Sequence, residues 1–411
     1  MAGEAWSEYL SCRLRSGKFV LVLYTNTKVL FELIKSGLWG TGASLSNYGE
    51  IGYSSVMSLA EEQSVVGLVT VGLERVKDVK IPQEWSLQFI GQTLQIEQRN
   101  KAMNAFVASL IKKLREAGIY TLLVKGQGIA QCYEKPLWRS CGDVDLFLSD
   151  DNYEKAKEFL TPLASSIEQE YKREKHLGMT INEWVVELHG RLYSGLSSRV
   201  ERVLDEVQKD TFYGGAVRSM TIQGSRFMVN GSTSESSVQV FMLKAENDVF
   251  YVFTHILQHF FKEGLGMRQV CDWCRLLWTF RDKLDLKMLE VRLRKAGLMS
   301  EWKAFGAYAV EYLGMPAEAM PFYSDGGRWK RKAKRINKFV LNVGNMGHKR
   351  GSWLKEHDSW LSRQFVVRKT FSMFRRIGDL MNHARIFPLD SLRFSFAIMR
   401  NGVKSAMRGE G

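Results

Sequence analysis

The sequence predicts an α+β fold in which a small mixed β-sheet is flanked by N-terminal and C-terminal helical regions. Apolar residues recur at helical spacing up to about residue 118 and again from about residue 246. Between them, short apolar runs alternate with helical segments in the order strand, helix, strand, helix, strand, strand. The chain has 411 residues, of which 45% are hydrophobic and 25% charged, so it is long and apolar enough to bury a sizeable core.

The expected elements follow one another along the chain. A long helix begins after Pro82 and ends before Gly118, because glycine is typical of the residue that follows a helix. The next elements are strands over 120–124 and 143–148, a helix over 153–160, and strands over 179–181 and 184–188. We therefore expect a helical region (1–118), an α/β core (119–240), a helical region on the substrate side (241–320) and a basic helical region (321–411).

The charge of the chain is concentrated near its C-terminus. Residues 321–411 contain 20 Lys and Arg against 6 Asp and Glu, an excess equal to the net charge of +14 of the whole chain. Two amphipathic helices are expected there, one carrying aromatic and basic residues over 360–376, with a break at Phe387-Pro388. Solvated helices are the first interpretation, peripheral contact with an anionic membrane surface the second, and nucleic-acid binding the third, since no nucleic-acid-binding motif is visible.

Hydropathy and cysteine content indicate a cytoplasmic protein, with peripheral contact at the inner face of the membrane as an extension of that interpretation. No run of 18 apolar residues exists, and the apolar stretch over 19–24 is too short for a secretory leader. Five cysteines in a long chain indicate reduced thiols. Cys271 and Cys274 have a C-x-x-C spacing without a second pair, so we expect buried helical cysteines rather than a zinc site.

Asp143 and Asp145 are the most informative residues, because they lie one residue apart inside an apolar run. Charges in a buried strand cost several kcal/mol each unless a partner compensates them, and a divalent metal ion is a natural partner. Alternate residues of a strand share a face, so both carboxylates point to one side while Val144 and Leu146 point into the core. By the same alternation, Val186 and Leu188 point into the core, and Glu187 points to the other face of its strand.

If these two strands are neighbours, Asp143, Asp145 and Glu187 converge as a catalytic, metal-binding set. Carboxylate oxygens are the ligands that Mg²⁺ prefers, and Mn²⁺ is an alternative. Lys125, Gly126 and Gln127 form a turn between a strand and a helix. A glycine there lets a phosphate approach the backbone, and the lysine adds a positive charge.

These motifs resemble the nucleotidyltransferase superfamily of DNA polymerase β, and more narrowly a largely uncharacterised bacterial branch of it. The similarity covers roughly residues 55–280. It is carried by Lys125-Gly126, Arg139, Gly142-Asp143-Val144-Asp145-Leu146, Glu187-Leu188-His189, His255, His259 and Asp272. One departure is Gly126-Gln127, where the superfamily usually has Gly-Gly or Gly-Ser.

The resemblance implies a Mg²⁺-dependent enzyme that moves a nucleotidyl group from a nucleoside triphosphate, such as ATP, to a hydroxyl acceptor that the sequence does not name; a sugar or polysaccharide is one class. Asp143, Asp145 and Glu187 would hold the metal ions, and Glu187 could also help to deprotonate the acceptor. The nucleotide would contact Lys125, Gly126, Gln127, Arg139 and Gly142.

A second group of residues is expected on the substrate side of the site: His189, His255, His259, Arg268 and Asp272. His189 either orients Glu187 or is a structural histidine. His255 and His259 have the i, i+4 spacing of zinc-binding helices, but the glutamate of H-E-x-x-H is absent, so a wall of the site or a hydrogen-bonded pair with Asp272 is preferred. Arg268 lies one helical turn before Asp272, which also fits a simple local ion pair.

Two other functions remain open from the sequence. The paired acids could hold Mn²⁺ and a sugar nucleotide in a D-x-D glycosyltransferase, although the Lys-Gly turn just before the motif argues against it. Alternatively, the chain could be a catalytically inactive scaffold that binds a membrane or a partner through its basic end.

Overall fold

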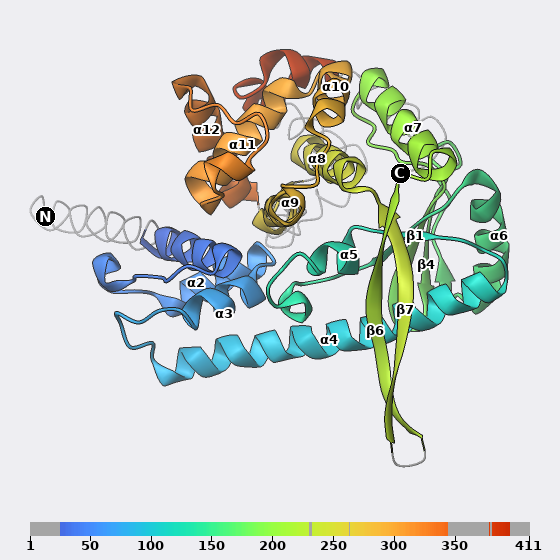
Figure 1. Cartoon of the computed structure of the whole chain (residues 1–411). Coiled ribbons are helices and arrows are strands. Elements are labelled where there is room, and N and C mark those ends of the chain that lie inside the picture. The colour runs from blue at the N-terminus through green and yellow to red at the C-terminus, as the bar shows by residue number, and fades with distance from the viewer. Residues whose placement is uncertain (1–24, 230–231, 263, 344–377, 379, 395–411) are drawn as a thin grey trace, which may run out of the picture.

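The computed structural model describes residues 25–229, 232–262, 264–343, 378 and 380–394. The N-terminal region is helical, as predicted. Residues 25–39 form a helix, and α2 (Tyr53–Glu62) and α3 (Val66–Leu73) follow it. The long helix α4 (Gln83–Glu116) then runs beneath both this helical group and the sheet (Figure 1). Gly118 follows α4 with φ of 72°, a conformation that favours glycine.

The sheet is mixed and has seven strands in the order β3-β4-β5-β2-β1-β7-β6. Four of the strands are those predicted from the sequence: β1 (Leu122–Val124), β2 (Val144–Phe147), β4 (His176–Ile181) and β5 (Trp184–His189). β2 pairs parallel with β5 and antiparallel with β1, so the predicted neighbourhood of the strands that carry the acidic residues is confirmed. The α+β fold class is therefore correct.

Three strands were not predicted: β3 (Ser166–Ile167), β6 (Val217–Val229) and β7 (Ser232–Leu243). β6 and β7 form a long antiparallel hairpin that projects past α4 (Figure 1). β7 joins the sheet beside β1 through the pair Leu122 and Phe241, and Arg115 of α4 donates to the Gln239 carbonyl oxygen at 2.8 Å. Polar residues are frequent in the hairpin, and its apolar alternation is confined to short stretches such as Val238, Val240 and Met242, which is too little to predict two long strands.

Helices cover the sheet and form the remainder of the described fold. Those within and after the sheet are α5 (Gly126–Ala130), α6 (Asp150–Leu160), α7 (Ser198–Tyr213), α8 (Ala245–Lys262), α9 (Met267–Phe280), α10 (Leu286–Ala296), α11 (Met299–Leu313) and α12 (Gly327–Val343). Short 3₁₀ turns are η1 (Ser46–Tyr48), η2 (Pro136–Trp138), η3 (Thr161–Leu163) and η4 (Ala317–Ala319). Cys271 and Cys274 are buried in α9, as predicted.

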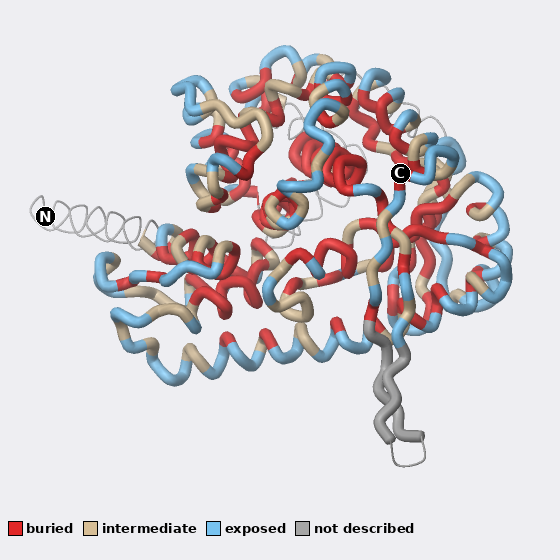
Figure 2. The backbone as a smooth tube through the Cα atoms, viewed as in Figure 1, coloured by how far each residue is buried: buried red, intermediate tan, exposed pale blue. Residues whose placement is uncertain are grey.

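Both faces of the central strands are buried (Figure 2). Leu123, Val144 and Leu146 belong to one apolar core, which also contains residues of α4 and α6. Val124 and Phe147 belong to a second and larger core, which contains the helices from α7 to α12. The face that carries the acidic residues is thus covered by the C-terminal helices, because strand alternation sends neighbouring side chains into different cores.

The basic region is described only in part. α12 buries Ala333, Ile336 and Val340 and exposes basic side chains that include Arg331 and Lys334. A second helical segment begins at Pro388 after a break, as expected. The amphipathic helix predicted over 360–376 lies outside the described residues. In the part of the chain that the structure describes, no helix is long and apolar enough to span a bilayer.

Candidate active site

Three carboxylates converge where β2 and β5 run side by side. The parallel register places Asp145 directly opposite Glu187, and Asp143 lies just before the first residue of β2. Asp143, Asp145 and Glu187 each offer a carboxylate oxygen, and these atoms all lie within 4.8 Å of one another. The set has the ligand type and convergence that a divalent cation requires.

The site lies between the sheet and the C-terminal helices rather than on an open face. Asp145 is 1% exposed, and Phe147, on the same face of β2, packs against Phe212 of α7 with ring centroids 4.7 Å apart. Asp143 is partly exposed, and the neighbouring Gly142 has open space around the position of a Cβ atom. Gly142 and Asp143 therefore lie at the accessible rim, while Asp145 lies in the interior.

Lys125 supplies the cation that compensates Asp145. Its Nζ lies 2.6 Å from Asp145 Oδ1, and its backbone has φ of 56°, which is uncommon for a residue with a side chain. Burial would lower the pKa of the Lys125 ammonium, but the surrounding carboxylates, Asp145 first, raise it well above its usual range. The lysine predicted to hold phosphates is thus a counter-ion of the acidic cluster.

Gly126 and Gln127 continue the turn into α5. Gly126 has φ of 32° and lies against the Asp143 carbonyl oxygen, where an added Cβ would be 3.4 Å away. The Gln127 side chain is buried, and its amide donates to the Met103 sulfur of α4. That side chain therefore lies in the core and not on an accessible surface.

Two histidines hold the carboxylate of Glu187. His189 Nε2 lies 3.4 Å and His176 Nε2 3.3 Å from Glu187 Oε2, and His189 Nε2 also lies 2.8 Å from Asp145 Oδ1. Burial would raise the pKa of Glu187, but the hydrogen bonds from His176 and His189 lower it far below the usual range of a glutamate. Burial would lower the pKa of His189, and its bonds to Asp145 and Glu187 raise it instead.

His176 is a site residue that the sequence analysis missed. It begins β4, and the antiparallel register of β4 and β5 places it directly opposite His189. The ring centroids of the two histidines are 4.8 Å apart. The sequence indicates only that a histidine lies shortly before the strand that contains Glu187-Leu188-His189. The pairing of His176 with His189 can be seen only in the tertiary structure.

The ionised form of the Asp143 carboxyl is disfavoured by its surroundings. Repulsion from Asp145 and then burial raise the pKa of the Asp143 carboxyl, while Lys125 and Arg268 act in the opposite direction. A carboxylate whose ionised form is disfavoured by its neighbours gains most from a bound cation. A nearby cation would therefore stabilise the ionised Asp143 carboxylate.

Helix α8 brings aromatic and imidazole side chains near the same site. His255 Nε2 lies 3.0 Å from His259 Nε2, so the two predicted histidines contact each other rather than Asp272. Burial and then the positive charge of Lys125 lower the pKa of His255 well below its usual value, which keeps this imidazole neutral at pH 7. Tyr251, also missed from the sequence, has its pKa raised to about 12 by burial and the nearby Asp145 and Glu187, although Lys125 acts to lower it.

Arg139 and Asp272 form a buried ion pair beside the site. Arg139 Nε and Nη2 donate to the two carboxylate oxygens of Asp272 at 2.9 and 2.6 Å, and Tyr133 donates to the same carboxylate at 2.8 Å. The remaining Nη1 of Arg139 donates to Ser140 O and to the Cys141 sulfur. The Arg139 guanidinium, predicted to contact a phosphate, is therefore engaged by protein groups in this structure.

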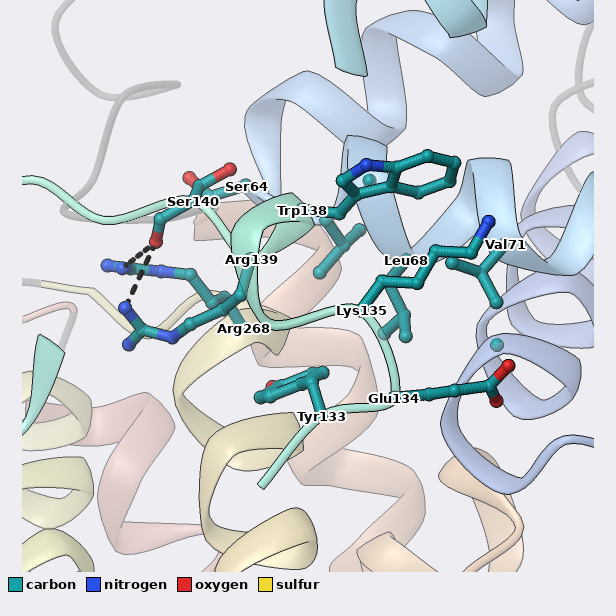
Figure 3. Close-up of a pocket in the computed structure, with 13 residues that line it drawn as sticks. Ser64, Leu68, Val71, Tyr133, Glu134, Lys135, Trp138, Arg139, Ser140 and Arg268 are labelled. Atoms are coloured by element: carbon teal, nitrogen blue, oxygen red, sulfur yellow. Dashed lines mark hydrogen bonds between the residues drawn. The ribbon is translucent and has the colours of Figure 1, made fainter. Parts of the chain in front are cut away.

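A small pocket opens next to this ion pair, between α3, η2 and the start of α9 (Figure 3). Arg268 of α9 lines it and donates through Nη1 to the Ser140 carbonyl oxygen at 2.8 Å. The local ion pair between Arg268 and Asp272 that their spacing allowed does not form, because Asp272 binds Arg139. Arg268 instead acts on Asp143 at the rim of the acidic cluster.

Three convergent carboxylates thus lie in a mixed sheet, beside a lysine-glycine turn and under the C-terminal helices, and they could bind a divalent metal ion. The chain belongs to the family described as uncharacterised nucleotidyltransferase, which matches residues 50–314. This match confirms the resemblance seen in the sequence. No curated protein and no solved structure matches the chain.

Proposed function

We propose that this protein is a Mg²⁺-dependent nucleotidyltransferase that moves a nucleoside monophosphate group from a nucleoside triphosphate to a hydroxyl acceptor. The observation that supports it most is the convergence of Asp143, Asp145 and Glu187 within 4.8 Å, in a chain of a nucleotidyltransferase family. A sugar or polysaccharide is the class of acceptor that we would test first.

The residues fit a divalent ion. All three donors are carboxylates, which Mg²⁺ prefers, and Mn²⁺ is accepted by the same donors. Asp143, Asp145 and Glu187 would hold the ion, which when bound would neutralise charge on the transferring phosphoryl group and on the attacking oxygen. Lys125 already supplies one positive charge at 2.6 Å from Asp145, which is consistent with a site built around cations.

The side chains of the site divide into two sides. Lys125 and the backbone of Gly126 and Gln127 would bind the triphosphate, with the lysine turning from Asp145 toward a phosphate oxygen. Tyr251 and His255 of α8 would face the acceptor, since their electrostatic partners include Lys125 and Glu187. Placement of both substrates against fixed charges is the main contribution that a protein makes to phosphoryl transfer.

The activity can be tested with labelled ATP, CTP, GTP and UTP, each incubated with the full-length protein, Mg²⁺ and a cell extract that supplies acceptors. We expect release of pyrophosphate and transfer of label from at least one nucleotide, both lost in the double variant Asp143→Asn with Asp145→Asn. The exposed Asp282→Asn is the matched control, because its side chain is 82% exposed on the surface. Equal turnover by the double variant and the wild type would refute the proposal.

Thermal unfolding with added ligands separates the other two functions considered from the sequence. Stabilisation by nucleoside triphosphates with Mg²⁺ supports nucleotidyl transfer. Stabilisation by UDP-sugars with Mn²⁺, and not by triphosphates, would instead establish a D-x-D glycosyltransferase. No metal-dependent stabilisation by either ligand would identify an inactive scaffold.

The basic C-terminal region supports a separate proposal of peripheral contact with an anionic membrane surface. Exposed basic residues of α12 lie opposite its buried apolar residues. We expect full-length protein to float with phosphatidylserine vesicles and not with neutral vesicles, and the double variant Arg331→Glu with Lys334→Glu to float less. Binding to RNA or DNA in place of vesicles would select nucleic acid as the partner.

A further inference from the structure

Glu187 belongs to a second cluster that could hold a metal ion, formed with His176 and His189. His176 Nε2 and His189 Nε2 approach the same oxygen, Glu187 Oε2, at 3.3 and 3.4 Å. All three side chains are partly exposed, so an ion from solvent can reach them. The residues come from the paired strands β4 and β5, whose register places His176 opposite His189.

The two contacts with Glu187 are long for hydrogen bonds, and their lengths also suit coordination of one ion by the three side chains. An N–H···O bond is shortest and strongest near 2.9–3.0 Å. Ligands at about 2.05 Å (nitrogen) and 2.1 Å (oxygen) from a tetrahedral ion lie about 3.4 Å apart. The contacts of both histidines with Glu187 match this separation without any movement of the strands.

We propose that His176, Glu187 and His189 form a site for a transition-metal ion, with Zn²⁺ as the best fit, that is distinct from the all-carboxylate site and shares Glu187 with it. Two imidazole nitrogens and one carboxylate are typical of zinc, whereas Mg²⁺ prefers oxygen donors. Three protein ligands leave a fourth position open to water or to an oxygen of a bound molecule.

The surrounding charges permit this ion. Besides the ligand Glu187, the carboxylate of Asp145 lies 2.8 Å from His189 Nε2, and the positive charge of Lys125 is paired with Asp145 at 2.6 Å. His189 also contacts Asp145, but Asp145 keeps its bond to Lys125 when His189 turns to a metal. The inference goes beyond the proposed transferase, because it does not require that a nucleotide binds.

The test is a titration of metal-stripped, full-length protein with Co²⁺, a spectroscopic substitute for Zn²⁺, in excess Mg²⁺ and without nucleotide. We expect about one equivalent of Co²⁺ to produce visible d–d absorption that Zn²⁺ abolishes. His176→Ala should weaken binding at least tenfold, a scale set by the loss of one ligand of three. Asp143→Asn, which leaves all three proposed ligands in place, should retain the absorption.

A second variant guards against loss of folding. His176→Cys replaces one zinc ligand by another, so it should retain binding and add a sulfur-to-cobalt charge-transfer band, while circular dichroism verifies the fold of each variant. Absence of the absorption in the wild type, its loss in excess Mg²⁺, or equal binding by the wild type and a folded His176→Ala would overturn the inference. Because no nucleotide is present, these outcomes are independent of whether pyrophosphate release is observed.

Discussion

Replacement of Asp143 by asparagine should stabilise the metal-free protein while it removes metal-dependent function. The Asp143 carboxylate has oxygen atoms within 4.8 Å of those of Asp145 and Glu187. At an effective dielectric constant of about 20, two like unit charges at such a distance repel by about 3.5 kcal/mol. Lys125 and Arg268 offset part of this repulsion, and the raised pKa of Asp143 shows that the repulsion wins.

We therefore expect Asp143→Asn to increase the free energy of unfolding in a buffer without divalent ions, by an amount smaller than the repulsion of about 3.5 kcal/mol because Lys125 and Arg268 offset part of it. Urea denaturation followed by circular dichroism measures this difference. The control Asp282→Asn, on the surface, should change the free energy by less than about 0.5 kcal/mol.

The difference should depend on pH and on metal. Since the folded state raises the pKa of Asp143, ionisation of this carboxyl costs stability, and the advantage of the variant is complete near neutral pH. It should disappear as the pH falls below the unfolded value near about 4, where both side chains are neutral. Added Mg²⁺ should stabilise the wild type more than the variant. A variant that is less stable than the wild type without metal at pH 7 would refute the electrostatic reasoning.

The ion pair beside the site and the packing of α3 each lead to another prediction. Arg139→Met should lower the free energy of unfolding by about 3–5 kcal/mol in urea denaturation, because Asp272 is left buried without its partner. The added change Asp272→Leu should recover much of that loss. A loss below about 1 kcal/mol would show that Arg139 does not stabilise the fold. Gly67→Ala should cost about 1–3 kcal/mol in thermal unfolding, since its Cβ would lie 2.0 Å from the Trp138 carbonyl oxygen. Gly91→Ala, in open space on α4, should instead gain about 0.5–1 kcal/mol, and equal effects of both substitutions would contradict this packing.

Much of the acidic cluster could be predicted from the sequence because its determinants are local. Asp143 and Asp145 share a face by strand alternation, and an apolar run around them indicates a buried strand. Glu187 could be added because its strand shows the same alternation, and the pairing of β2 with β5 confirms that inference. The helices before and after the sheet follow from their apolar periodicity.

Other parts of the site depend on residues distant in sequence. Arg139 was predicted to contact a phosphate, and only the structure shows that helix α9 brings Asp272 to it across 133 positions of the chain. Tyr251 lies within an apolar helix, so its sequence context gives no sign of a role in the site. The structure shows that α8 places it near Lys125. The hairpin of β6 and β7 contacts α4 through residues that lie 124 positions apart in the chain.

By itself, the sequence determined the type of fold, the two aspartates on one strand face, and the turn that contains Lys125, because strand periodicity and turn chemistry act over a few residues. The tertiary structure decided which charges meet. It paired Lys125 with Asp145 and placed His176 opposite His189, and both histidines contact Glu187. The physical reason is that ion pairs and ligand sets form between side chains that packing brings within about 4 Å, and sequence spacing does not encode that distance.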